Sequence, residues 1–388
     1  MNKRLNILFL SSWYPCRTDL YNGNFVQRHA ESVAIHANVY VLFAYSDERL
    51  KSVETEHFVK NGVDTCIIYY PKIKNKIPAF DNVLKYIYLK KLFLKSYIEL
   101  RNTIGQIDVI HVNVTYPIGL IALYLKRKFK IPYVITEHWT GYLPQNRDKL
   151  SPLVKQQSKK IISGASVVMP VSDNLRKSMQ ELGFKANYQV IPNVVDTKLF
   201  GIKEVFHKPL GFIHVSTLID KHKNISGILR TIKRLSKKGK DFTFTIIGDG
   251  DLKPHIRYAE QLEIPKEIIT FEGAKPIEKI AEAMQKSDVF VLFSNYENLP
   301  CVISEAHSCG LPVISTDVGG VHEMIDDLNG ILVSVKNENT LLEKMEHMLN
   351  HFNTYNTNEI RRKATERYAY DKVGKQMVAV YNKVLKIN

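Results

Sequence analysis

The sequence predicts an α/β protein made of two doubly wound domains. Its 388 residues are enough for two separate hydrophobic cores. In both halves of the chain, short apolar runs of strand length alternate with segments of helical period, which is typical of parallel sheets joined by helices. The alternation pauses at residues 197–209, where we expect the linker. The expected domains are therefore residues 1–200 and residues 201–370.

The strands expected in the first half are short, apolar and rich in β-branched or aromatic residues. They are Leu5–Leu10, Val39–Phe43, Cys66–Tyr70, Val109–Val112, Tyr133–Thr136, Ser166–Val171 and Gln189–Ile191. A helix is expected over Phe25–Ile35 and another from Val83 onward. Ser172 is expected to cap a helix, since a serine hydroxyl accepts the first free N–H groups.

The second half repeats this architecture without repeating the sequence. Its expected strands are Gly211–Ser216, Phe242–Ile247, Ile269–Phe271, Val289–Phe293 and Pro312–Ser315. Its expected helices are Ile277–Lys286, a short helix that opens at Pro300 and ends by Gly310, and a closing helix over Tyr370–Leu385. Proline suits the first position of a helix and glycine suits the residue after its end.

The stretch Phe293–Ser315, FSNYENLPCVISEAHSCGLPVIS, carries the strongest functional pattern. It predicts a strand, a polar loop, a helix and a second strand, and ligands in such units lie beyond the carboxyl ends of the strands. Glu297 is expected in the loop and Glu305 on the helix. A carboxylate accepts two hydrogen bonds and so can hold a vicinal diol. Without further context, two glutamates at this spacing are more often solvated side chains.

The wider pattern E-N-L-P-x-V-x-x-E-A-x-x-x-G-x-P-V-I, from Glu297 to Ile314, resembles the donor-binding signature of the retaining glycosyltransferases of family 4. This resemblance implies the GT-B fold, in which two Rossmann-like domains face each other across a deep cleft. Residues 201–370 would bind the nucleotide-sugar donor. Residues 1–200 would form the acceptor side, completed by the closing helix at 371–388.

The resemblance also implies roles for single residues. Glu305 would bind the ribose hydroxyls and Glu297 the hydroxyls of the transferred sugar. Lys223, in V-S-T-L-I-D-K-H-K-N, would meet the donor diphosphate, and His138, in T-E-H-W, would approach the donor sugar. The backbone at the helix start would add contacts to the donor at Asn298, Leu299, Pro300 and Cys301.

Some positions match the family less closely. Thr217 stands where the family usually has an arginine, and a threonine cannot grip a phosphate through two parallel bonds. The first loop has a single glycine, Gly23, followed by Asn24, where many members have two glycines. Gly248 and Gly250 resemble the family's I-G-x-G segment, although a tight strand-to-helix turn has the same pattern. We keep all five as candidate donor-binding residues.

Positive charge is concentrated in the first half of the chain. Residues 1–200 contain 28 Lys and Arg against 15 Asp and Glu, a difference of +13, and residues 201–388 contain 26 against 24, a difference of +2. No nucleic-acid motif accompanies this charge, so an anionic membrane surface is the favoured partner. In the helix expected from Val83, apolar residues alternate with Lys85, Lys90, Lys91 and Lys95, which suits a membrane interface. A core helix with a solvated lysine face is the alternative.

The remaining features suggest a cytoplasmic protein that is peripheral on the inner face of the cell membrane. No apolar run approaches the ~18 residues of a membrane span. The first apolar run stops at Leu10 without a cleavage site, so it predicts a buried strand rather than a signal peptide. Four scattered cysteines, without metal-ligand or disulfide spacing, predict free thiols. They are Cys16, Cys66, Cys301 and Cys309.

The expected activity is transfer of a hexose-type sugar from a nucleotide-sugar to a lipid-linked or polysaccharide acceptor, with retention of configuration and without a metal or other cofactor. Its setting would be the synthesis of cell-surface glycans. A nicotinamide-dependent dehydrogenase is disfavoured, because the first loop lacks G-x-G-x-x-G. A nucleotide-sugar epimerase of the same fold and an inactive sugar-nucleotide-binding partner subunit remain alternatives.

Overall fold

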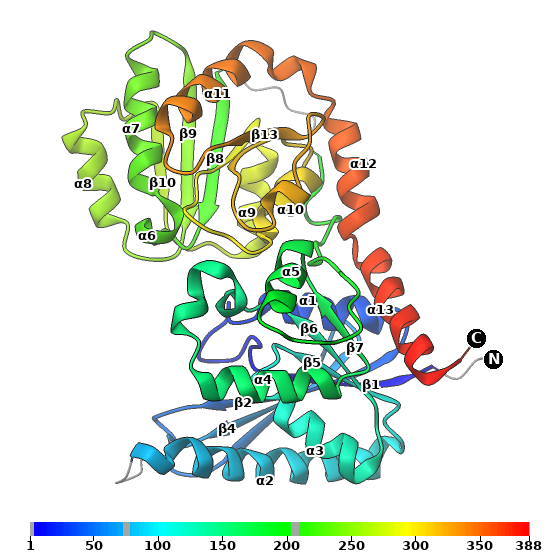
Figure 1. Cartoon of the computed structure of the whole chain (residues 1–388). Helices are drawn as coiled ribbons and strands as arrows, with labels where there is room; N and C mark the ends of the chain where they lie inside the picture. The colour runs from blue at the N-terminus through cyan, green and yellow to red at the C-terminus, as the bar shows by residue number, and fades with distance from the viewer. Residues whose placement is uncertain (1–3, 73–77, 203–208, 388) are drawn as a thin grey trace. The chain divides into compact units, whose positions relative to one another are not determined.

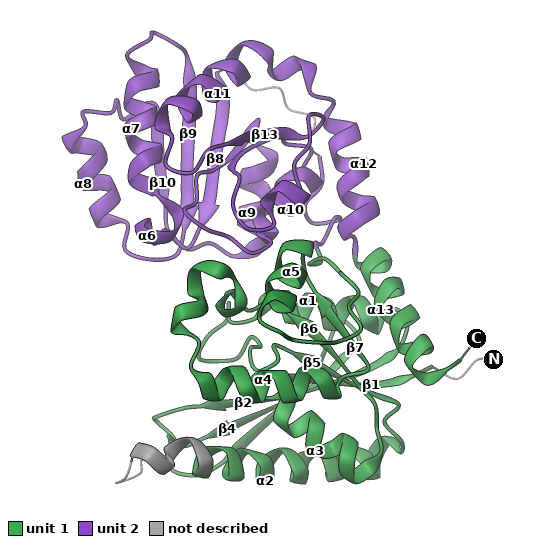
Figure 2. Cartoon of the chain, viewed as in Figure 1, with its two compact units in different colours: residues 1–194, 370–388 green, residues 195–369 purple. Residues whose placement is uncertain are grey.

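The computed structural model describes residues 4–72, 78–202 and 209–387, without the side chains of residues 78–83. The chain divides into two compact units (Figures 1 and 2). Unit 1 comprises residues 1–194 and 370–388, and unit 2 comprises residues 195–369. Part of the expected linker, residues 203–208, lies outside the described residues.

In the described part of the chain, unit 1 has a seven-stranded sheet in the order β3-β4-β2-β1-β5-β6-β7. The strands are β1 (Asn6–Ser11), β2 (Asn38–Ser46), β3 (Glu54–Lys60), β4 (Val63–Tyr70), β5 (Val109–Asn113), β6 (Tyr133–Glu137) and β7 (Val167–Pro170). All neighbours pair in parallel except β3 and β4, which are antiparallel. The central strands β1, β5 and β6 are buried along their whole length, because helices cover both faces of the sheet (Figure 1).

The helices of unit 1 are α1 (Asn24–Ala34), α2 (Pro78–Ile104), α3 (Gly119–Phe129), α4 (Pro152–Gly164), α5 (Asp173–Glu181) and α13 (Tyr370–Leu385). Short 3-10 turns at Thr140–Tyr142 and Pro144–Lys149 precede α4. The hydroxyl of Ser172 accepts the Leu175 N–H at 3.0 Å, which confirms the expected cap of α5. The helix expected from Val83 begins earlier, at Pro78.

The closing helix α13 packs against α1 in unit 1. A Cβ placed on Gly374 would lie 2.1 Å from the carbonyl oxygen of Ser32, so the two backbones meet at a distance that only glycine allows. The hydroxyl of Tyr381 lies 2.6 Å from Nδ1 of His111 on β5, and both residues are fully buried. The end of the described chain is therefore part of the core of unit 1.

The segment Gln189–Ile191 is not a strand, contrary to expectation. It runs beside β7: the N–H of Gln189 donates to the Val168 carbonyl, and the N–H of Ile191 donates to the Pro170 carbonyl. The pairing is limited to one isolated β-bridge, between Tyr188 and Val168. Pro170 has no N–H to donate to the neighbouring segment, and this interrupts the ladder at the edge of the sheet.

Strand β3 was not expected, because its residues are mostly polar and exposed and show no buried face.

In the described part of unit 2, six parallel strands have the order β10-β9-β8-β11-β12-β13. They are β8 (Leu210–Ser216), β9 (Phe242–Gly248), β10 (Ile269–Glu272), β11 (Val289–Leu292), β12 (Val313–Thr316) and β13 (Gly330–Val333). The helices are α6 (Asp220–Lys223), α7 (Ile225–Ser236), α8 (Lys253–Gln261), α9 (Ile277–Gln285), α10 (Cys301–Ser308), α11 (Glu338–His351) and α12 (Thr357–Tyr368). Short 3-10 turns lie at Val321–Glu323 and Phe352–Thr354.

Each sheet has one topological switch point, where the strand order reverses. In unit 1 it lies between β1 and β5, and in unit 2 between β8 and β11. In open parallel sheets, ligands bind beyond the carboxyl ends of the strands at such a point. The switch point of unit 2 is where the Glu297 loop follows β11.

Candidate functional site

An ion pair between Lys223 and Glu297 lies at the switch point of unit 2. Lys223 ends α6, which follows β8, and Glu297 lies in the loop after β11. The Lys223 Nζ donates to Glu297 Oε1 at 2.5 Å, and both side chains are mostly buried, at 16% and 10% exposure. The structure therefore brings together two of the residues predicted from the sequence.

The same carboxylate oxygen accepts a second hydrogen bond, from the Ser294 hydroxyl at 2.7 Å. The carbonyl oxygen of Ser294 in turn accepts from the hydroxyl of Thr316, at the end of β12, at 2.7 Å. Residues from neighbouring strand ends thus fix the carboxylate of Glu297. The sequence analysis did not identify Ser294 or Thr316, since their contacts depend on β11 and β12 being neighbours in the sheet.

Backbone contacts join the loops that carry the ion pair. The N–H of Asn295 donates to the His222 carbonyl at 2.7 Å, and the Asn295 side chain donates to the Lys221 carbonyl at 2.9 Å. The His222 and Tyr296 rings meet edge to face, with centroids 5.0 Å apart. The loop after β8 and the loop after β11 are therefore held as one structure.

The helix expected to open at Pro300 is α10, which begins one residue later, at Cys301, with Pro300 as its N-cap. Glu305 lies on this helix. Its side chain is buried, with 4% of the residue exposed, so Glu305 is not a solvated surface residue. Asn298, Leu299 and Pro300 precede the helix and are also buried. Proline has no N–H, so Pro300 cannot supply the backbone donor expected there.

The loop after β12 packs onto the Glu297 loop. The N–H of Gly320 donates to the Asn298 carbonyl at 2.8 Å. Gly319 has φ +59°, and a Cβ on it would lie 2.0 Å from the Glu297 carbonyl oxygen. A residue with a side chain would both strain the backbone there and clash with the neighbouring loop.

The other candidates of unit 2 gather at the carboxyl ends of β8 and β9. Thr217 is exposed just after β8, and Gly250 approaches its carbonyl oxygen; a Cβ on Gly250 would lie 3.3 Å from it. Gly248 ends β9, and a Cβ there would lie 1.8 Å from the carbonyl oxygen of Ser216. Packing against β8 is thus sufficient to require a glycine at 248.

A buried histidine, which the sequence analysis did not identify, joins the two strands at this switch point. His214 Nδ1 lies 2.8 Å from the Val291 carbonyl of β11 and its Nε2 lies 2.7 Å from the Ser216 hydroxyl. The carbonyl can only accept, so Nδ1 carries the proton and Nε2 accepts from Ser216. Burial lowers the pKa of His214 to about 4, which keeps the imidazole neutral.

Glycine 23 lies at the start of α1 in unit 1. It has φ +66° and precedes Asn24, the first residue of the helix. A Cβ on Gly23 would lie 2.5 Å from the carbonyl carbon and oxygen of Trp13, so the fold alone requires glycine there.

His138 follows β6 and packs between side chains of α1. Its ring centroid lies 4.5 Å from that of Phe25 and 5.2 Å from that of His29. Burial, with a smaller contribution from His29 and His111, holds its pKa well below the usual value, so the ring is neutral. Glu137 before it is fully buried and accepts the N–H groups of Thr115, His138 and Trp139.

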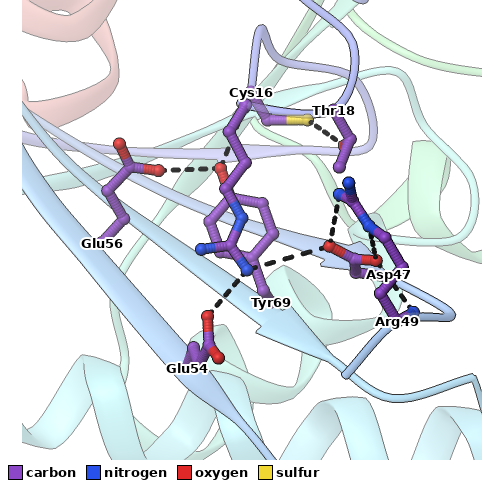
Figure 3. A network of polar contacts seen from close by, with 8 residues as sticks. Cys16, Thr18, Asp47, Arg49, Glu54, Glu56 and Tyr69 are labelled. Carbon is purple, nitrogen blue, oxygen red and sulfur yellow. Dashed lines mark hydrogen bonds and ion pairs between the residues drawn. The ribbon is translucent and has the colours of Figure 1, made fainter.

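A polar network fixes the loop between β1 and α1 (Figure 3). The Tyr69 hydroxyl, on β4, donates to Glu56 on β3 at 2.8 Å and accepts the N–H of Arg17 at 3.1 Å. The Arg17 guanidinium lies 4.0 Å over the Tyr69 ring and 2.7 Å from the Glu54 carboxylate. The edge hairpin β3–β4 thus holds the loop that leads to Gly23.

Asp249 and Asp251 flank Gly250 and form an Asp-x-Asp pair in the sequence. Oδ1 of Asp251 accepts the N–H of Lys253 at the start of α8 at 3.0 Å. Across residues 4–72, 78–202 and 209–387, no three His, Cys, Asp or Glu side chains gather as a metal site.

None of the described helices is long and apolar enough to cross a bilayer. The four cysteines are free thiols.

Two parallel-sheet α/β units of this kind are typical of the GT-B fold. In solved structures, the chain is similar to sucrose-phosphate synthase from Thermosynechococcus elongatus, with a TM-score of 0.77, 16% identity and coverage of 98% of this chain and 99% of that one. It is also similar to HepE of Anabaena in complex with UDP, with a TM-score of 0.74, 16% identity and coverage of 98% and 100%.

Sequence comparison identifies the family. The model "Glycosyl transferases group 1" matches residues 195–370, and "Glycosyltransferase Family 4" matches residues 38–199. The chain belongs to the group 1 glycosyltransferases. A putative teichuronic acid biosynthesis glycosyltransferase of Bacillus subtilis, TuaC, is 29% identical over 248 residues, which are 61% of this chain and 60% of TuaC.

Proposed function

We propose that this glycosyltransferase transfers a hexose from a nucleotide-sugar to a hydroxyl of a lipid-linked or polysaccharide acceptor, with retention of configuration. The observation that carries the proposal is the buried Lys223–Glu297 pair at the switch point of unit 2, beside the helix that bears Glu305. In this position, the ammonium group of Lys223 can contact a diphosphate, and each of the carboxylates of Glu297 and Glu305 can accept hydrogen bonds from a diol.

In the proposed complex, Glu305 accepts hydrogen bonds from the ribose hydroxyls and Glu297 from the sugar hydroxyls. Lys223 neutralises the diphosphate as negative charge develops on it, which is where a fixed cation lowers a barrier most. HepE, a structural neighbour, has been crystallised with UDP and with UDP-glucose, and this supports a uridine nucleotide as the first candidate.

The proposed reaction proceeds on one face of the sugar. The bond from the anomeric carbon to the diphosphate oxygen breaks, and a bond to the acceptor oxygen forms on the same face. The acceptor's proton goes to the leaving phosphate. Because the acceptor oxygen bonds directly to the anomeric carbon, no covalent sugar–enzyme intermediate is formed. His138, which is neutral in this structure, would serve as a hydrogen-bonding group for the donor sugar rather than as a cation. We propose that the reaction needs no divalent metal.

The biological setting is proposed from the relatives and from the charge. The name of TuaC refers to teichuronic acid biosynthesis, and this supports a role in making a cell-surface polysaccharide. The charge of +13 on residues 1–200 supports a location in the cytoplasm at the inner face of the membrane, because anionic lipids attract basic side chains. A lipid-linked acceptor would lie at that surface.

The test is to incubate the protein with a panel of nucleotide-sugars and candidate acceptors, and to read the anomeric configuration of the first product by NMR. Transfer with retention supports the proposal, and an inverted product contradicts it. Turnover without an acceptor would indicate the epimerase, the alternative of the same fold. Tight nucleotide binding without any turnover would indicate an inactive partner subunit.

A further inference from the structure

One solvent-facing stripe of α2 combines apolar and basic side chains. Leu84, Ile87, Lys91, Lys95 and Ile98 are all exposed, with 44%, 56% and 47% of Leu84, Ile87 and Ile98 accessible to solvent. Their spacing of three, four, four and three residues places them on one face of the helix. We call these five residues the α2 stripe.

The opposite face of α2 accounts for the stability of the helix without the stripe. Phe93 and Tyr97 are buried, and the Tyr97 ring packs against Phe129 of α3, with centroids 4.9 Å apart. Lys90 Nζ lies 3.7 Å above the Tyr124 ring of α3. Because the other face already provides the packing, the exposed Leu84, Ile87 and Ile98 are not needed for the core of unit 1.

Further exposed basic side chains lie on α2 and on the neighbouring helix α3. Lys85 on α2 and Arg127, Lys128 and Lys130 at the end of α3 are exposed. Among the described residues, the one ion pair of the stripe is a long exposed contact of 3.9 Å between Lys95 and Glu99. Such an exposed pair contributes little, so the lysines are available to an anionic partner.

We propose that the α2 stripe binds the surface of an anionic lipid bilayer. Leu84, Ile87 and Ile98 insert at the level of the headgroups, and Lys91 and Lys95 reach the lipid phosphates with their ammonium groups. Charge complementarity selects this partner, since the exposed Lys91 and Lys95 lie between the exposed Ile87 and Ile98 on the same stripe. This inference rests on the proposed location at the membrane and names the surface that binds there. It is tested separately from the transfer reaction, because binding to vesicles needs neither donor nor acceptor.

The experiment is sedimentation of the full chain with phosphatidylcholine vesicles that contain or lack phosphatidylglycerol. We expect binding to the anionic vesicles only, weakened by salt. Lys91→Glu/Lys95→Glu should reduce the partition coefficient by about thirtyfold or more, since each lysine near an anionic surface contributes about 1 kcal/mol. Ile87→Ser/Ile98→Ser should also reduce binding, and more of this loss should persist at high salt.

Matched controls separate a local surface from the overall charge. Lys237→Glu/Lys240→Glu changes exposed lysines of unit 2 and, like the stripe variant, lowers the formal charge by four, from +15 to +11. Leu328→Ser matches the removal of an exposed apolar side chain. Both controls should bind as the unchanged protein does.

Three results would overturn the proposal. The first is equal binding to neutral and anionic vesicles, and the second is an equal loss in the Lys91/Lys95 and Lys237/Lys240 variants. The third is binding to single-stranded DNA, but not to vesicles, that depends on Lys91 and Lys95. Circular dichroism of each variant ensures that the loss is not due to unfolding.

Discussion

The Nζ of Lys223 lies 2.5 Å from Oε1 of Glu297, although 74 residues separate them in the chain. Adjacent strands, β8 and β11, carry the two residues to the same edge of the sheet. The carboxylate is held by Ser294 as well as by Lys223. The cation that would meet the diphosphate thus also orients the carboxylate that would bind the sugar.

Lys223→Ala should lower kcat by about a hundredfold, because a fixed charge near the leaving group is lost. It should also lower the midpoint of thermal unfolding, since Glu297 remains mostly buried without its cation. Lys221→Ala is the matched control, because the Lys221 side chain is exposed and its contact with Asn295 uses only the backbone carbonyl. Unchanged kcat and KM in Lys223→Ala would remove this residue from the site.

Glu305→Gln should weaken binding of the nucleoside diphosphate by about tenfold, since a hydrogen bond to a charged group contributes about 1.5–3 kcal/mol. Isothermal titration with the ribonucleotide and its 2′-deoxy form tests the assigned contact. The unchanged protein should prefer the ribonucleotide, and the variant should lose much of that preference. Glu278→Gln, on the exposed face of α9, is the control. Equal discrimination by both variants would rule out ribose binding by Glu305.

Gly319→Ala should abolish most activity and cost at least ~2 kcal/mol of stability, because the new Cβ would clash with the Glu297 carbonyl. Gly239→Ala separates the clash from the strain. Gly239 has a similar φ, +66°, but nothing lies within 4 Å of the added Cβ. It should cost only about 1 kcal/mol and leave kcat unchanged. Urea denaturation and initial rates measure both effects, and equal behaviour would contradict the role given to the contact.

Tyr69→Phe should destabilise unit 1 by about 1–2 kcal/mol, because the hydroxyl is lost from Glu56 and from the Arg17 N–H. Hydrogen exchange should rise in residues 12–23, the loop that this network holds. Tyr40→Phe is the control, since among the described residues no hydrogen bond of the Tyr40 hydroxyl is seen. Unchanged exchange in the loop would show that the network does not hold it.

Stability should fall as the pH is lowered from about 6.5 towards about 4. Burial lowers the pKa of His29, His214 and His307 to about 4, from about 6.5 for a solvated histidine. In this window the unfolded chain binds protons that the folded chain excludes, so acid favours unfolding. Each histidine contributes up to about 1.4 kcal/mol per pH unit to the slope. Urea denaturation across the window measures it, and His307→Gln should reduce it. A flat profile would contradict the prediction.

The sequence pattern predicted most of the parallel strands, because each is a buried apolar run bounded by polar residues. It did not predict β3, whose polar side chains face solvent on an edge. Glu297, Glu305 and Lys223 could be proposed because their spacing matches a known signature. Ser294, Thr316 and His214 could not be proposed, since their contacts depend on which strands are neighbours in the sheet. The spacing of residues within one segment does not reveal the strand order. The clash that requires Gly319 likewise arises between two separate loops.

The packing of α13 on α1 affects the order in which the chain acquires its structure during synthesis. Unit 2 is continuous, so it can fold as soon as its own residues have left the ribosome. Unit 1 must wait for residues some 340 positions downstream of α1, and until then His111 lacks Tyr381 and the part of α1 around Ser32 lacks the cover of α13. The half that emerges first is thus the last to be finished, and a nascent chain exposes this surface to chaperones for most of its translation.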